Sequence, residues 1–156
     1  MNFDKEKLIK ALSSAVAETF EGMAFSELEE TEVLNEIPLT DKEYSFSRLA
    51  ALEPFEGQIG LFVPNAYLQE ILETTIDPET EVDMEKMRDD LVAEILNTIA
   101  GSFMSKLLPD SQEFKIGLPS KTHDYPENKV KMKENDLGLK LMIEFHEVYC
   151  YLEFIN

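Results

Sequence analysis

The stretch Thr80–Pro109, TEVDMEKMRDDLVAEILNTIAGSFMSKLLP, organises the rest of the sequence. Its apolar residues recur at steps of three or four residues: Met84, Met87, Leu91, Ile95, Ile99 and Phe103. This spacing places side chains on one side of an α-helix. We therefore predict a long helix here, with this apolar side packed into the core.

The opposite side of the same helix carries a polar stripe with small neighbours. At about 100° per residue, a band about 60° wide contains Asp90, Glu94, Asn97 and Gly101, bordered by Ala93 and Ala100. Lys86 lies on the same stripe. Because alanine and glycine leave room above a helix, another molecule could approach this stripe closely. We treat Asp90, Ala93, Ala100 and Gly101 as candidate partner-binding residues.

Glu94 and Asn97 are three residues apart, so their side chains lie one above the other on one helical turn. A carboxylate can hold a cation, and an amide, which is both donor and acceptor, can orient a water molecule. Neither role requires a nucleophile on the protein. The bare Glu-x-x-Asn pattern also occurs on many solvated helices without any function, so its surroundings decide how it is interpreted.

The run Asp90-x3-Glu94-x2-Asn97-x3-Gly101 resembles the signature of the CheC/CheX/FliY family of response-regulator phosphatases, most specifically in AEILNTIAG. The chain length, the later segment KIGLPSK and the paired apolar segments near the C-terminus are similar to the single-site CheX branch. The resemblance implies a CheC-like fold and a homodimer with one active helix per chain. It also implies hydrolysis of the aspartyl phosphate on a phosphorylated CheY-like response regulator in chemotaxis.

In the roles that the resemblance implies, Asn97 positions the attacking water and Glu94 pairs with a lysine of the regulator. A Mg²⁺ ion would belong to the regulator, and no intrinsic cofactor is expected. Asp90 either orients Glu94, contacts the partner or is simply a solvated acid, and Lys86 is equally ambiguous.

Two other functions fit the same pattern. A non-catalytic CheC-like module would bind response regulators or flagellar-switch components without hydrolysis, because a fold alone does not establish catalysis. Glu94 and Asn97 favour the enzyme, since a docking helix has no need of that amide. Alternatively, the partner is a receiver domain from a pathway other than chemotaxis.

The composition predicts a cytoplasmic protein with one domain over residues 1–156. The formal charge of −18 argues against nucleic acid or an anionic membrane as partner. The single cysteine, Cys150, excludes an intrachain disulfide and is expected to be a small strand residue. His123 and His146 are far apart in sequence, which makes an intrinsic zinc site improbable, and no signal-peptide or membrane-spanning apolar run occurs.

The remaining elements follow from periodicity and from proline and glycine positions. We predict a first helix over residues 4–23, with Gly22 near its end, and a short helix after Pro64 with Asn65 as its cap. The long helix begins between Asp77 and Asp83, either of which could cap it. Strands are expected over residues 32–37, 43–52, 58–63, 113–118, 139–145 and 148–155, and a loop with some strand over 121–135.

A short internal repeat predicts how these elements are arranged. ETFEGM in the first helix aligns with NTIAGS in the long helix, and about three strands follow each helix. A duplicated helix-plus-three-strands unit gives a mixed α/β (α+β) fold, with about six strands in one sheet and two long helices on one face. In this alignment Ala15 replaces Glu94 and Glu18 replaces Asn97, which leaves one site per chain.

Overall fold

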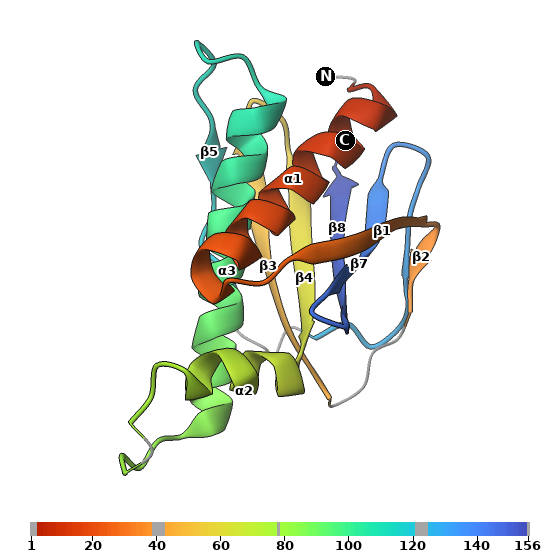
Figure 1. The fold of residues 1–156 in the computed structure, drawn as a ribbon. Coiled ribbons are helices and arrows are strands. Elements are labelled where there is room, and N and C mark those ends of the chain that lie inside the picture. Colours follow the sequence, from red (N-terminus) through yellow and green to blue (C-terminus); the bar gives the residue numbers. More distant parts are fainter. Residues whose placement is uncertain (1–2, 39–42, 78, 121–124, 156) are drawn as a thin grey trace.

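The computed structural model describes residues 3–38, 43–77, 79–120 and 125–155. Two long helices, α1 (Lys5–Ala24) and α3 (Met84–Leu107), and a shorter helix, α2 (Asn65–Glu73), lie on one side of an antiparallel sheet (Figure 1). The predicted mixed fold with two long helices on one face and a short extra helix is confirmed.

The main sheet has six strands among the described residues, in the order β1-β7-β8-β4-β3-β5. Their bounds are β1 (Leu28–Leu34), β3 (Tyr44–Glu53), β4 (Gly57–Pro64), β5 (Lys115–Ile116), β7 (Leu137–Ile143) and β8 (His146–Phe154). A separate two-stranded sheet pairs β2 (Glu36–Ile37) with β6 (Val130–Lys131). The six-stranded sheet predicted from the sequence is therefore present.

The strand order is symmetric about the central β4–β8 pair. The first half contributes α1, β1, β3 and β4, the second contributes α3, β5, β7 and β8, and corresponding strands lie at mirrored positions. The aligned threonines make the same contact: Thr19 Oγ1 donates to the Ala15 carbonyl (2.7 Å), and Thr98 Oγ1 donates to the Glu94 carbonyl (3.1 Å). The structure thus has the duplicated unit that the repeat predicts.

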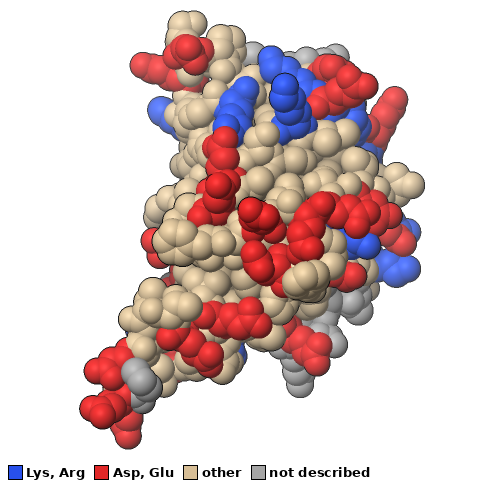
Figure 2. All heavy atoms as spheres, in the orientation of Figure 1, with Lys and Arg blue, Asp and Glu red and all other residues tan. Residues whose placement is uncertain are grey.

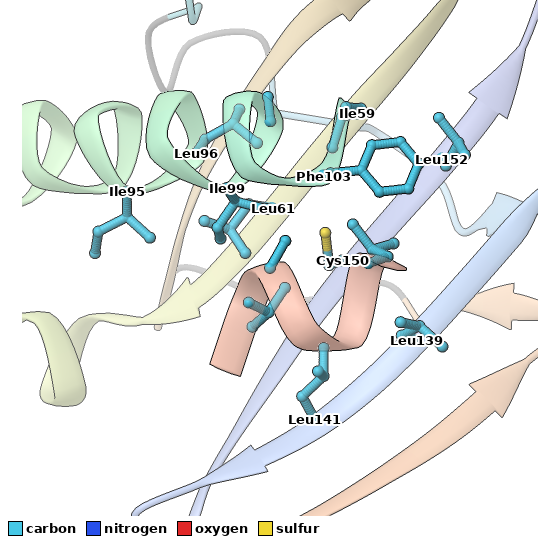
Figure 3. Packing of buried hydrophobic residues seen from close by; sticks show 14 of the residues in the cluster. Ile59, Leu61, Ile95, Leu96, Ile99, Phe103, Leu139, Leu141, Cys150 and Leu152 are labelled. Atoms are coloured by element: carbon cyan, nitrogen blue, oxygen red, sulfur yellow. The ribbon is translucent and has the colours of Figure 1, made fainter. Parts of the chain in front are cut away.

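Alternating strand residues bury their apolar side chains beneath the two long helices. α1 packs over β7 and β1, α3 packs over β3 and β4, and the helices pack against each other. Figure 3 shows the centre of this layer, which contains Ile59, Leu61, Ile95, Leu96, Ile99, Phe103, Leu139, Leu141, Cys150 and Leu152. Cys150 is fully buried, and burial raises the pKa of its thiol to about 12, so it is a packing residue.

The other face of the sheet carries a second apolar cluster under β2 and β6, made of Ile37, Phe46, Phe62, Tyr149 and Tyr151. β4 contributes to both faces, since Ile59, Leu61 and Val63 pack under the helices and Phe62 packs on the opposite side. Both faces of this strand are therefore buried, as is usual for a central strand with the continuous apolar run IGLFV.

The helix ends differ in part from the sequence-based expectation. Asp83 caps α3, since its side chain accepts a hydrogen bond from the Lys86 backbone N–H (3.2 Å), which settles the choice left open with Asp77. Asn65 is the first residue of α2, not its cap. Gly22 lies within α1, which ends instead at Phe25 in the left-handed conformation (φ 53°).

Two strand predictions need correction. The first strand begins at Leu28, four residues earlier than expected, because its exposed glutamates hide the apolar alternation of an edge strand. β5 is only two residues long. In the segment 121–135, residues 121–124 lie outside the described residues, and β6 supplies the strand expected there.

Candidate functional site

α3 is buried along a wider arc than the predicted apolar side. Ile95, Ile99 and Phe103 lie in the core as expected, but the core also contains Val92, Leu96, Ala100, Met104 and Leu107. Met84, Met87 and Leu91, in the first two turns, are only partly buried. Figure 1 shows the reason: the start of α3 extends past the sheet, near α2, whereas its later turns lie on the sheet beside α1.

Glu94 and Asn97 both lie on the exposed side of α3, in its well-packed part. Glu94 is followed directly by Ile95, and Asn97 is preceded directly by Leu96. Both of these neighbours are buried core residues, so packing fixes the backbone that carries the pair. Within the described residues, neither side chain makes a hydrogen bond or an ion pair. A carboxylate and an amide are thus presented together on one turn of a rigid helix, both available to an external partner.

The acidic residues continue from this pair toward the start of the helix. Asp90 is exposed one turn before Glu94. Beyond it, a shallow hollow of about 420 Å³ is lined by Asp83, Glu85, Lys86, Asp89 and Asp90. Lys86 is the one cationic side chain among the five that line this hollow, so the local charge is negative. A partner that covers this end of α3 would need a cationic group.

The small residues beside the pair do not all lie where the sequence places them. Ala93 and Gly101 are partly exposed, and a Cβ atom added at Gly101 would meet nothing within 4 Å in this chain. Internal packing therefore does not require glycine there. Ala100, in contrast, is 0% exposed and belongs to the core under α1. Its expected place beside the accessible stripe is wrong, because the buried core extends to this border of α3 at the level of Ala100.

The equivalent positions on α1 carry no such pair. Ala15, aligned with Glu94, is completely buried. Glu18, aligned with Asn97, is exposed and forms an ion pair with Lys106 of α3, with 2.8 Å between Oε1 and Nζ. The contact with Lys106 could not be predicted from the sequence, because it joins two helices far apart in the chain. The described structure presents one Glu/Asn pair, as the repeat predicted.

No group of three or more His, Cys, Asp or Glu side chains among the described residues could hold a metal ion. His123 lies outside the described residues, and His146 packs against Tyr67 with its Nε2 3.2 Å from Glu70 Oε2. The expectation that the chain has no intrinsic metal or cofactor stays a prediction. In the same part of the structure, every helix is too short or too polar to span a membrane.

Comparison with known proteins identifies the family of this chain. The model of the chemotaxis phosphatase CheX family matches residues 50–145, a range that includes Glu94 and Asn97. The chain therefore belongs to the CheX family of chemotaxis phosphatases, which confirms the resemblance found in the sequence. No match was found among curated protein sequences.

Solved structures show the same fold over nearly the whole chain. A CheC-like superfamily protein from Shewanella sp. PV-4 is 15% identical, with 98% of this chain and 100% of that chain covered and a TM-score of 0.73. A putative chemotaxis protein from Desulfovibrio vulgaris Hildenborough is 14% identical, with 96% and 97% covered and a TM-score of 0.72. A chain of the CheX–CheY–BeF3–Mg²⁺ complex from Borrelia burgdorferi is 12% identical, with 96% and 98% covered and a TM-score of 0.64.

Proposed function

We propose that this protein hydrolyses the aspartyl phosphate of a CheY-like response regulator in chemotaxis signalling, with Asn97 and Glu94 as its catalytic residues. The observation that carries the proposal is the exposed Glu94–Asn97 pair, which has no partner among the described residues and is held on a packed helix. Membership of the CheX family supports the phosphatase class. The Borrelia burgdorferi complex, in which a CheX and a CheY are together, supports the class of partner.

An acyl phosphate is already activated, so its hydrolysis needs mainly a water molecule held in line with the phosphorus and stabilisation of charge. The Asn97 amide can accept a hydrogen bond from that water and donate one to a neighbouring oxygen, which fixes the water's orientation. Glu94, one turn earlier, then forms an ion pair with a lysine of the regulator and sets the depth to which α3 enters. The step balances as follows: water supplies the hydroxyl that bonds to phosphorus, its other proton passes to the released phosphate, and the bond between phosphorus and the aspartate oxygen breaks so that the aspartate leaves as a carboxylate.

The surrounding geometry suits insertion into a partner's site. α3 is held by the core on both sides of Glu94, so little conformational entropy is lost when its side chains are placed. Ala93 and Gly101 leave space for the partner's backbone beside the pair. Asp90 extends the negative surface toward a cationic partner. The Mg²⁺ ion needed for charge stabilisation is proposed to be held by the regulator. We also propose that the chain works in the cytoplasm as a homodimer.

The direct test measures phosphate release from a phosphorylated CheY-like receiver in the presence of Mg²⁺. Wild type should accelerate release, and Asn97→Ala or Glu94→Ala should each remove most of the acceleration, on the order of 100-fold for a misplaced water. Glu18→Gln is the matched control, since it alters the aligned position of α1 and should leave the rate unchanged.

All variants are first compared with wild type by circular dichroism and thermal melting, so that a loss of rate is not a loss of fold. If wild type binds the receiver without accelerating release, the pair is a docking contact. The non-catalytic module would then replace the phosphatase as the function of this chain.

A further inference from the structure

Two phenylalanines at one corner of the molecule are almost fully exposed. Phe25, which ends α1, is 91% exposed, and Phe145, in the turn between β7 and β8, is 83% exposed. Both have left-handed backbone conformations, with φ of 53° and 65°. Bulky residues rarely adopt this conformation, and glycine or asparagine would fit it without strain. Neither packing nor backbone geometry inside the chain accounts for an aromatic side chain at either position.

The segments that carry these two residues are held together by reciprocal hydrogen bonds. The Glu27 backbone N–H donates to Glu144 Oε1 (3.2 Å), and the Phe145 backbone N–H donates to Glu29 Oε1 (2.8 Å). β1 and β7 also pair here, with Leu28 opposite Ile143. The exposed rings are therefore carried on a fixed platform, which lowers the ordering cost of binding a partner.

A hollow of about 680 Å³ opens beside Phe145. The residues that line it include two glutamates, Glu43 and Glu147, and two aromatic residues, Tyr44 and His146. Carboxylates and aromatic faces together attract lysine and arginine side chains. The hollow thus has the composition expected of a site for a basic side chain.

The charge of the surrounding surface is negative. Acidic side chains cover the middle of the visible face in Figure 2, where β1 runs in Figure 1, while lysine and arginine lie mainly near its upper and right-hand edges. Glu27, Glu29 and Glu144 belong to the segments that carry the two phenylalanines and are all exposed. An apolar patch with a negative rim is complementary to an apolar surface with a positive rim.

We propose that this corner, defined by Phe25, Phe145 and the hollow beside Phe145, is a docking surface for a basic amphipathic protein segment. Apolar side chains of the segment cover the two phenylalanine rings, and a lysine or arginine enters the hollow between Glu43 and Glu147. The proposal does not depend on the phosphatase reaction, because it uses none of the residues of the α3 pair.

The test uses the full chain and a synthetic helical peptide of about 18 leucines and lysines arranged with one apolar and one basic face. Its dissociation constant is measured by fluorescence anisotropy, and its contact residues by amide chemical shifts. A second peptide with the same lysines has serine in place of every leucine. We expect shifts concentrated in residues 25–29 and 143–147, and binding at least about tenfold tighter than that of the serine peptide.

The double variant Phe25→Asn/Phe145→Asn should weaken binding of the leucine peptide at least about tenfold, since asparagine suits the left-handed backbone and the fold is kept. Leu118→Ser, which removes another apolar side chain that is 91% exposed, is the matched control and should have no effect. Equal weakening by both variants, or shifts spread over the whole surface, would overturn the proposal. Sedimentation supplies a further outcome: if the asparagine variant converts a dimer to a monomer, the corner is a contact between copies of this chain and the proposal is wrong.

Discussion

Lys106 in the last turn of α3 forms an ion pair with Glu18 of α1, with 2.8 Å between Nζ and Oε1. Glu18 is the α1 residue aligned with Asn97, and the residue aligned with Glu94 is the fully buried Ala15. The second half of the duplication therefore presents the exposed Glu94–Asn97 pair, while the first half uses the same positions for packing and for an inter-helix contact. In this symmetric fold the two α1 positions have structural contacts, whereas the aligned α3 positions are exposed on the surface.

This asymmetry predicts that a second site cannot be built on α1 by copying the pair. Ala15→Glu would place a carboxylate in the apolar core and should lower the free energy of unfolding by about 3 kcal/mol or more. Glu18→Asn removes only an exposed ion pair and should cost at most about 1 kcal/mol. Urea unfolding of the two single variants measures both values. Equal stability of the two would show that α1 can move to expose residue 15.

Ala100→Leu should destabilise the protein by about 1–3 kcal/mol, because the added atoms enter a filled core. Ala93→Leu, two turns earlier on the same border of the stripe, is partly exposed and should change stability by about 0.5 kcal/mol or less. On the proposed function, Ala93→Leu should instead weaken binding of the receiver. Thermal melting and a binding titration of both variants separate the two effects. A stable Ala100→Leu variant with impaired binding would return Ala100 to the partner surface.

These two alanines show what the sequence can and cannot predict. Helical periodicity placed Ile95, Ile99 and Phe103 in the core and Glu94 and Asn97 outside it, because those positions follow from 3.6-residue geometry alone. Ala93 and Ala100 are seven residues apart on the same border of the stripe, yet Ala93 is partly exposed and Ala100 is buried. Periodicity within one helix carries no information about which neighbour covers its border.

The end of α1 and the start of the first strand were not predicted correctly from the sequence, for different reasons. Gly22 is a usual helix terminator, but the helix passes through it and ends at Phe25, where a left-handed backbone is adopted by a residue that does not favour it. In β1 three of the four exposed residues are glutamates, which have low strand propensity, so the strand is set by its pairing with β7. Tertiary contacts override local preference in both cases.

Gly101→Ala should raise the free energy of unfolding by about 0.5–1 kcal/mol, since alanine favours the helix and the added Cβ meets no atom of this chain. If the partner approaches this position, the same change should slow phosphate release from the receiver. Gly60→Ala is the contrasting variant, because its Cβ would overlap the buried Tyr151 ring, and it should destabilise the protein. Urea unfolding and the release assay on both variants test the prediction. A Gly101→Ala enzyme that is stabilised and fully active would show that the partner does not contact this glycine.

Alkaline pH should destabilise the fold through Cys150. Burial raises the pKa of its thiol from 9.0 to about 12 in the folded protein. The unfolded chain therefore releases the thiol proton between these two values while the folded chain keeps it, so the free energy of unfolding falls as pH rises above about 9. Tyr67 adds to the fall at higher pH, since burial raises the pKa of its phenol from 10.0 to about 12. Below pH 9 both groups are protonated in both states, and neither contributes a slope.

Urea unfolding at several pH values between 7 and 11 measures this dependence. Cys150→Ala removes the thiol and leaves a small cavity, so its stability should be lower at pH 7. Its stability should nevertheless decline less steeply than that of wild type above pH 9, because one group with a raised pKa is gone. The slope, not the absolute stability, is the test. Parallel curves for the two proteins would mean that the thiolate is tolerated in the core, which is possible only if the packing around Cys150 opens to water.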